Sequence, residues 1–411
     1  MADGLVAVGS GLGARLGGLK WWQQVLLVFL ASRIVTTIIF CVFAALQPAS
    51  ERTGASPDYF TFATLWDGQW YWLISLQGYP TDLPHDAAGQ LGENAWAFLP
   101  AYPLLMRVLT LGGLISFPAL APIVSTVFAA GAALVFFQIA RRVLPAASAL
   151  FAVVLLCVAP LSPILQASYA ESMHLLLLLS ALLLLLQRRY LVLIPVAIVM
   201  SLTRPSGLAF ALLLLAHLIH RIATRRGDPF APREVGGIVA AGLLTAAAGV
   251  SWIFVAWAVT GDSAAYTDTE LVWRRAYIGD QHLLPFTSWF QGAHWWLSFA
   301  GVDSVSAWVL GAVLVTALVL AFGAFLFSPW AKRMGVDLRL WVAAYALYLL
   351  AVFFPQTSTF RLLVPLAPLL IALAVPRSRG LRVALVILGV VGQIAWMDVS
   401  WWVNGVDWTV P

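Results

Sequence analysis

Charged residues are scarce in this chain. Asp, Glu, Lys and Arg together make up only 10% of its 411 residues, whereas 62% are hydrophobic and the mean hydropathy is +0.91. Soluble domains are about one-quarter charged, and a domain with so little charge would aggregate in water. The composition therefore excludes a soluble enzyme and predicts a protein that crosses a membrane several times.

Cysteine is also scarce, and the common motifs for metals and nucleotides are absent. Cys41 and Cys157 both lie inside apolar runs, where a packing role is favoured over the alternative of a disulfide. The sequence contains no P-loop, dinucleotide fingerprint, HExxH, zinc-type Cys/His spacing or Asp-x-Asp. His217 and His220 share a helical face, but no acid is near them in the sequence. We therefore expect no metal and no cofactor. We also expect no nucleic-acid partner, because the basic residues cluster between apolar runs.

The apolar runs are continuous, which is typical of helices, whereas the strands of a transmembrane barrel would alternate. A helix of roughly 20 apolar residues crosses a bilayer. We predict an all-α transmembrane bundle with about eleven spans, at residues 22–47, 116–140, 145–165, 170–187, 190–203, 206–220, 235–260, 304–328, 338–354, 360–375 and 381–400. Pro205 and Gly207 separate two short runs, so we expect that hairpin to be shallow or tilted.

The spans leave two large loops, and we predict a single integral-membrane domain over residues 1–411. A short lead precedes the first span, and the loops follow the first and seventh spans, at residues 1–20, 48–115 and 261–303. Within the first loop, interfacial or re-entrant helices are expected around 64–76 and 98–110.

Basic residues indicate the orientation of the chain. In this layout one side of the membrane carries most of the basic residues, namely Arg141, Arg142, Arg188, Arg189, Arg221, Arg225, Arg226, Arg233, Lys332, Arg333, Arg339, Arg377, Arg379 and Arg382. Short basic loops stay in the cytoplasm, so we expect a cell-membrane protein with a cytoplasmic N-terminus. Most carboxylates and both large loops fall on the other side, which we expect to be extracytoplasmic.

One stretch of the first loop places an acid among aromatic rings. Asp67 lies beside Trp66 and close to Trp70 and Tyr71. Trp and Tyr favour the bilayer interface, so Asp67 is predicted to lie in a partly dry setting where a carboxylate can accept a proton. Aromatic faces also pack well on sugars, which favours a site for a sugar or a lipid headgroup. The structural alternative is that Asp67 caps a helix beginning at Gly68.

Other charged residues near the spans call for a functional or structural explanation. Inserting one charged residue into a membrane helix costs a free energy of roughly 2.5–3.5 kcal/mol on insertion scales. Glu171 begins a Leu-rich run, and His174 follows one helical turn later. We interpret the two as a second polar wall of the Asp67 cavity. The alternatives are an acid favoured by the helix dipole and an ordinary hydrogen-bonded histidine.

Four arginines on the predicted outer side are candidates for binding the phosphate of an anionic lipid. They are Arg204, Arg274, Arg275 and Arg361. A guanidinium group is a fixed fork of donors and tolerates an apolar flank, whereas the alternative for each arginine is snorkelling to headgroups. Further residues that we assign to substrate binding are Trp66, Gln69, Trp70, Tyr71, Tyr102 and Gln356.

An ordered set of short motifs spans most of the chain. They are Trp66-Asp67-Gly68-Gln69-Trp70-Tyr71, Gly78-Tyr79, Ala97-Phe98-Leu99-Pro100-Ala101-Tyr102-Pro103-Leu104-Leu105, Tyr169-Ala170-Glu171-Ser172, Leu202-Thr203-Arg204-Pro205-Ser206-Gly207-Leu208 and Arg361-Leu362-Leu363-Val364-Pro365-Leu366. Together they resemble the signature of PIG-V-type mannosyltransferases, which are integral-membrane glycosyltransferases of the GT-C class. A strong bias toward arginine over lysine gives the chain a bacterial appearance.

The resemblance implies a GT-C-like fold and a role in glycolipid biosynthesis. The family's acid in the first outer loop falls on Asp67, and the implied donor is a polyprenyl phosphate mannose. Our hypothesis is an inverting transfer without a metal, in which Asp67 takes the proton of an acceptor hydroxyl on a glycolipid or glycan. Three alternatives remain: a transporter or flippase of a lipid-linked sugar, a non-catalytic subunit of a glycosyltransferase complex, and a pentosyl donor in place of mannose.

Overall fold

The computed structural model describes residues 18–87, 89–229, 231–403 and 411. Over these residues the secondary structure is helical, apart from an isolated bridge between His85 and Leu91. The predicted all-α class is therefore confirmed.

In this part of the chain, six helices are long and apolar enough to cross a membrane. They are α2 (Trp21–Leu46), α6 (Phe117–Ala140), α10 (Gly207–Thr224), α11 (Pro232–Thr260), α14 (Ser304–Leu326) and α18 (Arg379–Trp396), which a π turn extends to Trp401. Three shorter apolar helices are α7 (Ala146–Val158), α8 (Glu171–Leu186) and α9 (Tyr190–Ser201). Six candidate spans indicate a multi-pass membrane protein.

These nine helices fall on nine of the eleven predicted spans. The tenth span coincides with α16 (Val336–Val352). The eleventh, predicted at 360–375, is broken into the 3-10 helix η5 (Arg361–Leu366) and the short helix α17 (Leu369–Leu373). Pro365 and Pro368 explain the break, because proline cannot donate a backbone hydrogen bond inside a helix. The number of eleven crossings therefore stays a prediction.

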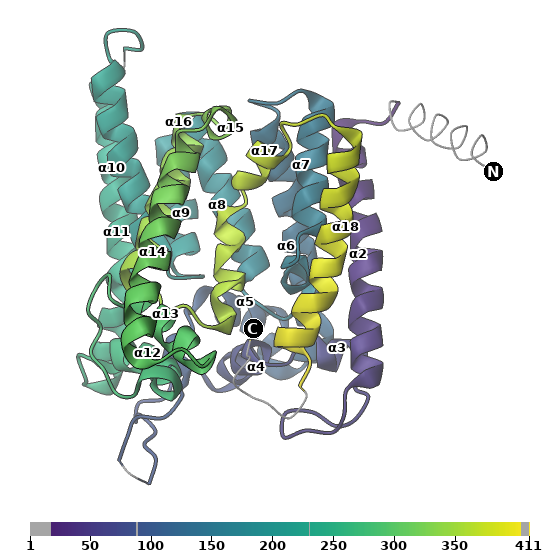
Figure 1. Ribbon diagram of the computed structural model, residues 1–411, viewed down its shortest axis with the longest axis vertical. Coiled ribbons are helices and arrows are strands. Elements are labelled where there is room, and N and C mark those ends of the chain that lie inside the picture. Colours follow the sequence, from purple (N-terminus) through teal and green to yellow (C-terminus); the bar gives the residue numbers. More distant parts are fainter. Residues whose placement is uncertain (1–17, 88, 230, 404–410) are drawn as a thin grey trace, which may run out of the picture.

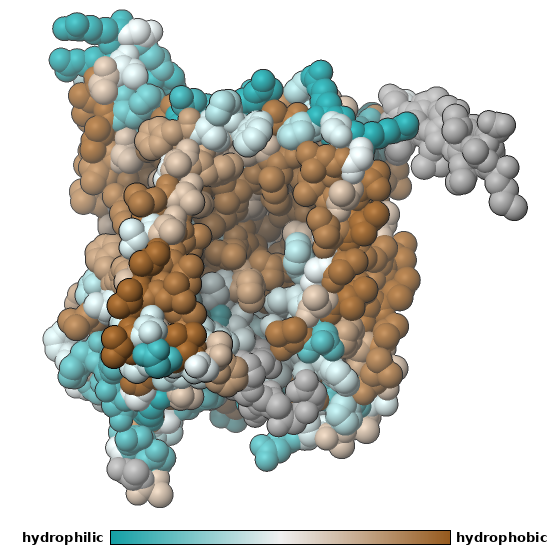
Figure 2. Space-filling view, in the orientation of Figure 1, coloured by the Kyte–Doolittle hydropathy of each residue, from teal (hydrophilic) through white to brown (hydrophobic). Residues whose placement is uncertain are grey.

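The helices run side by side, and short helices gather at one end of the bundle (Figure 1). These are α3 (Tyr59–Phe62), α4 (Asp67–Gln77), α12 (Ala265–Ile278) and α13 (Ser288–Phe299), and we call this end the α4 end. The opposite end carries the α10–α11 hairpin and α15 (Pro329–Lys332). Figure 2 shows a hydrophobic band between hydrophilic rims at the two ends, with a hollow in the middle of this face. Helices expected in the first loop are present as α4 and α5 (Ala101–Leu109).

A buried arginine ties the first long helix to the break after α7. The guanidinium of Arg33 donates to the carbonyl oxygens of Cys157 (2.7 Å) and Ser162 (2.9 Å), and its side chain is buried. Those carbonyls lie where α7 ends and the 3-10 helix η3 (Ser162–Gln166) begins. Arg33 thus replaces helical hydrogen bonds that the break removes. Cys157 is buried and Cys41 exposed, and both are free thiols, so they form no disulfide with one another.

Two glycines let α10 and α11 approach closely beside the α4 end. A Cβ at Gly249 would lie 3.0 Å from the backbone nitrogen of Leu208, and a Cβ at Gly207 would lie 2.8 Å from the Cα of Gly249. Small residues allow this kind of close backbone contact between membrane helices. The crossing fixes the position of the loop between α9 and α10, which carries Arg204.

Gly249→Leu is expected to lower stability by about 1–3 kcal/mol, because the added side chain forces α10 and α11 apart. Thermal unfolding of the purified protein in detergent measures the change as a lower melting temperature. The matched control is Gly323→Leu on α14, where a Cβ has open space around it. Equal melting temperatures for the two variants would contradict the close crossing.

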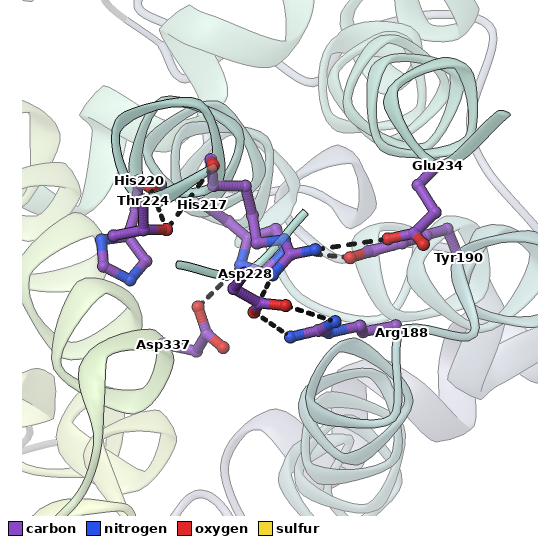
Figure 3. A network of polar contacts seen from close by, with 9 residues as sticks. Arg188, Tyr190, His217, His220, Thr224, Asp228, Glu234 and Asp337 are labelled. Carbon is purple, nitrogen blue, oxygen red and sulfur yellow. Dashed lines mark hydrogen bonds and ion pairs between the residues drawn. The ribbon is translucent and has the colours of Figure 1, made fainter. Parts of the chain in front are cut away.

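A polar network joins α9, α10, α11 and α16 at the opposite end (Figure 3). Asp228 accepts hydrogen bonds from Arg188 and from Arg221. His217 on α10 lies 2.7 Å through Nδ1 from the Asp337 carboxylate on α16, and its Nε2 contacts the Tyr190 hydroxyl at 3.1 Å. The sequence had suggested no acid near His217, because Asp337 is close to it only in the fold. We interpret His217 as a structural link between helices.

Candidate functional site

A cavity of about 320 Å³ lies at the α4 end, where elements from the whole chain meet. Its polar lining residues include Asp67, Glu171, His174, Arg204, Ser206, Glu270, Arg274, Gln356 and Arg361. Seven of the predicted site residues are among these nine: Asp67, Glu171, His174, Arg204, Arg274, Gln356 and Arg361. The fold therefore gathers residues that are up to 294 positions apart in the sequence.

Asp67 is placed by a strained turn at the start of α4. The residue before it, Trp66, has φ 60° and ψ −124°. A bulky residue with positive φ costs on the order of 1–3 kcal/mol and persists only when its surroundings hold it. The Trp66 indole is buried and donates through Nε1 to the Trp401 carbonyl at 2.8 Å, and the Asp67 backbone N–H donates to the Tyr169 hydroxyl at 3.0 Å. Strain concentrated at this position favours a functional role for Asp67.

The Asp67 carboxylate forms an ion pair with the Arg361 guanidinium. The two side chains are 16% and 14% exposed, so both reach the cavity without being open to bulk solvent. Arg361 also lies over the Tyr169 ring, with 5.7 Å between its Cζ and the ring centroid. The alternative that Asp67 caps a helix beginning at Gly68 is wrong. Helix α4 begins at Asp67 itself and its N-cap residue is Trp66, while the Asp67 carboxylate faces Arg361.

A second acid–arginine pair lies next to the first. Glu171 is the first residue of α8 and only 4% exposed, and its carboxylate lies 3.2 Å from Arg204. Arg204 also donates to the Tyr71 hydroxyl at 3.4 Å. One turn along α8, His174 contacts the Ser206 hydroxyl through Nε2 at 2.7 Å. Glu171 and His174 thus line the same cavity as Asp67.

Several polar atoms of the cavity lack a hydrogen-bond partner among the residues that the structure describes. They are both carboxylate oxygens of Glu171, of which Oε1 has only the ion pair with Arg204, together with Oε1 of Gln356 and Nε of Arg361. Buried polar atoms are almost always hydrogen-bonded, and each exception calls for a reason. Two acceptor side chains and one donor turned to the same cavity are what a ligand with several hydroxyl groups and an anionic group would satisfy.

Helix α12 supplies a wall that sequence reasoning largely missed. Tyr266, Glu270 and Arg274 recur at every fourth position and line the cavity. The opposite face anchors the helix, because Thr269 is buried and accepts a hydrogen bond of 2.9 Å from the Asn94 side-chain amide. Burial raises the pKa of the Glu270 carboxyl to about 7, and the nearby arginines act against the rise. The sequence did contain a signal for this wall, because Glu270 and Arg274 are four residues apart and so lie on one face of an amphipathic helix.

Arg275 and Gln69, both predicted site residues, lie outside the cavity lining. Arg275 pairs with the Asp280 carboxylate at 2.6 Å and donates to the Leu91 carbonyl at 2.9 Å. Gln69 donates to the Arg52 carbonyl at 3.0 Å. Neighbouring residues on a helix point about 100° apart, so Arg274 reaches the cavity and Arg275 does not.

The aromatic residues predicted to bind substrate also stand behind the cavity wall. The Tyr71 and Tyr102 rings are buried edge to face, 5.1 Å apart, and the Tyr102 hydroxyl lies 3.1 Å from that of Ser125. Trp70 stacks on Phe98, with 5.6 Å between ring centroids. Together with Trp66 they form packing that supports α4, and Tyr266 and Tyr348 line the cavity in their place.

The remaining wall of the cavity is apolar. It is built by Leu208, Val250 and Ile253 from α10 and α11, by Leu349 and Val352 from α16, and by Leu362 and Val364 from η5. A cavity lined by three arginines, three carboxylates and several aliphatic side chains suits an amphipathic ligand. The carboxylates can accept protons, and the arginines can hold an anionic group.

A scan against protein-family models and a search of curated proteins found no significant match to this chain.

Proposed function

We propose that this chain is a membrane mannosyltransferase that uses a polyprenyl phosphate mannose donor and a lipid-linked or glycolipid acceptor. The observation that carries the proposal is the cavity at the α4 end. It combines a carboxylate at a strained turn, arginines for a phosphate, unpartnered polar atoms for hydroxyl groups, and an aliphatic wall for a lipid chain. The sequence resemblance to PIG-V-type enzymes supports mannose as the sugar.

In the proposed reaction the acceptor hydroxyl oxygen attacks the anomeric carbon of the donor. Asp67 takes the hydroxyl proton as the new C–O bond forms, and the bond from the anomeric carbon to the phosphate oxygen breaks. The electron pair leaves with the polyprenyl phosphate, and attack from the opposite face inverts the anomeric configuration. Arginines offset the charge on the departing phosphate, so the step needs no metal.

The Asp67–Arg361 pair has a consequence for this step. Inversion places the base and the leaving group on opposite faces of the anomeric carbon. The two side chains therefore separate when the donor binds, and the Arg361 guanidinium moves to the phosphate. An incoming phosphate thus frees the Asp67 carboxylate for the acceptor proton.

The other cavity residues have roles that follow from their chemistry. Oε2 of Glu171 and Oε1 of Gln356 are acceptors without a hydrogen-bond partner among the described residues, and they orient sugar hydroxyls. Arg204 and Arg274 contribute to the phosphate site. Arg275 is excluded from it, because its guanidinium is held by Asp280 outside the cavity.

The topology belongs to the same proposal. The chain has about eleven spans in a GT-C-like arrangement, with a cytoplasmic N-terminus and the α4 end facing the extracytoplasmic side. A lipid-linked donor then reaches the cavity sideways through the bilayer, where its chain meets the aliphatic wall.

Membranes from cells that express the chain should transfer radiolabel from polyprenyl phosphate mannose to a second glycolipid or glycan. Control membranes carry an equal amount of the Asp67→Asn variant. Label recovered only in intact donor would contradict a transferase, and label moved equally by both membranes would assign the activity to another protein. The same assay with a pentosyl donor tests the choice of sugar.

A further inference from the structure

The cavity holds three carboxylates and three arginines, but only two acid–arginine pairs are in contact. Arg361 contacts Asp67, and Arg204 contacts Glu171. Glu270 and Arg274 face the same cavity, and within the described part of the chain neither forms an ion pair. Among the described residues, the charges of Glu270 and Arg274 are therefore the ones in the cavity that no ion pair neutralises before a ligand enters.

Arg274 is already fixed in position. Its guanidinium donates to the Ser288 hydroxyl at 3.0 Å and to the Val352 carbonyl. Both partners are neutral, so they orient the guanidinium and leave its charge uncompensated. An arginine held in this way is ready to bind an anion without reorganisation.

Glu270 is the acid nearest to Arg274 along α12. It lies one helical turn before Arg274 on α12, so the two side chains are neighbours. An ionised Glu270 offsets the positive charge and repels an anionic headgroup, and the repulsion is strong where water is largely excluded. A protonated Glu270 removes the repulsion and can donate a hydrogen bond.

We propose that Glu270 is a proton-linked positioning residue, and that the donor phosphate binds at Arg274 as Glu270 takes up a proton. This inference rests on the proposed function, and it adds the place of the phosphate and a dependence of its binding on pH. The reaction itself releases the acceptor proton to Asp67, so the two carboxylates have separate tasks.

Charged and titratable groups from five elements face Glu270. They are Tyr266 and Arg274 on α12, Arg204 in the loop before α10, Arg361 on η5, Asp67 on α4 and Tyr348 on α16. Arginines do not titrate in the accessible pH range, and Asp67 is paired with Arg361. Burial raises the pKa of Glu270 to about 7, which places its titration within the range of an ordinary binding experiment.

Donor affinity is expected to decrease as the pH rises. Below its pKa Glu270 is neutral and the phosphate binds well, whereas above it the proton must be taken up from solvent. Affinity then falls by up to about tenfold for each pH unit. For a pKa near 7, we expect about a tenfold loss between about pH 6 and about pH 8.

The experiment measures binding of radiolabelled polyprenyl phosphate mannose to the purified full chain in lipid nanodiscs, with no acceptor present. The phosphodiester of this probe keeps one negative charge over the whole range, so a pH effect belongs to the protein. Glu270→Gln mimics the protonated acid and should bind with little pH dependence, as tightly as the wild type does near pH 6. Asp268→Asn is the matched control, because Asp268 is exposed on the same helix outside the cavity lining.

Wild type and Asp268→Asn should both lose about tenfold in affinity over this range, while Glu270→Gln stays level. If Glu270→Gln keeps the wild-type slope, or the wild type has none, the inference is wrong and the donor assignment stands. If none of the three proteins binds the probe at any pH, the proposed function is wrong together with this inference.

Discussion

Replacing Asp67 with Asn should lower the turnover of sugar transfer by about 10²- to 10⁴-fold. The change keeps the shape of the side chain and removes its ability to accept a proton. Because the carboxylate is paired with Arg361, thermal unfolding should be measured on the same preparation. A variant that remains folded and still binds donor while turnover collapses has lost the base.

The control for this prediction is Asp58→Asn. Asp58 lies in the same loop, is exposed, and caps α3 by accepting the Thr61 backbone N–H at 2.9 Å. Asparagine caps helices equally well, so turnover should stay within about twofold of the wild type. If the folded Asp67→Asn variant turned over at the wild-type rate, the assignment of Asp67 as the general base would be wrong.

Replacing Arg361 with Ala should lower kcat/KM for the donor by about 10²- to 10³-fold, the usual loss when one preorganised group that stabilises charge is removed. KM for the acceptor should change far less, because the proposed contact of Arg361 is with the phosphate. Arg361→Lys should recover only part of the loss, because an ammonium group cannot form the two parallel bonds of a guanidinium.

Arg275→Ala provides the comparison for Arg361→Ala. It removes an arginine from the α4 end whose partner, Asp280, lies outside the cavity. Donor kinetics close to the wild type are expected. The double variant Asp67→Asn, Arg361→Ala should lose less than the two single losses combined, because the residues act on one step. Unchanged donor kinetics in Arg361→Ala would exclude Arg361 from the phosphate site.

Sequence reasoning located the charged residues of the site better than the aromatic ones. Asp67, Glu171, Arg204 and Arg361 could be found because a charge at a membrane surface is costly and calls for a partner or a ligand. Trp66 was predicted to bind substrate, but its indole packs behind the strained turn and donates to the Trp401 carbonyl. The sequence could not distinguish these roles, because an aromatic side chain at an interface serves packing and binding equally well.

Other features depended on helix phase and on distant contacts. The sequence could not tell which of Arg274 and Arg275 faces the cavity, because that depends on how Thr269 anchors α12 to Asn94. It also missed Glu270, although the spacing of Glu270 and Arg274 places both on one face of α12. His217 acquires its acid, Asp337, from a helix 120 residues further along the chain, and no local pattern reports such a contact.

Most of the apolar helices could be predicted from hydropathy, since continuous apolar runs are the strongest signal that a membrane protein offers. One exception lies beside the cavity. The run predicted at 360–375 is broken at Pro365, and its first turn carries Arg361 into the cavity. The departure from a regular helix thus coincides with the proposed phosphate site, and membrane proteins tolerate irregular backbone where it lines a cavity or is buried in protein.

The most direct test of the central claim uses the purified protein in liposomes with polyprenyl phosphate mannose, labelled in the sugar, and a membrane lipid extract as acceptor. The proposal predicts that label passes to a new glycolipid while an equal amount of polyprenyl phosphate is released, and that Asp67→Asn does neither. Label that crosses the liposome membrane still attached to the donor, with no polyprenyl phosphate released, would contradict it and identify a transporter instead.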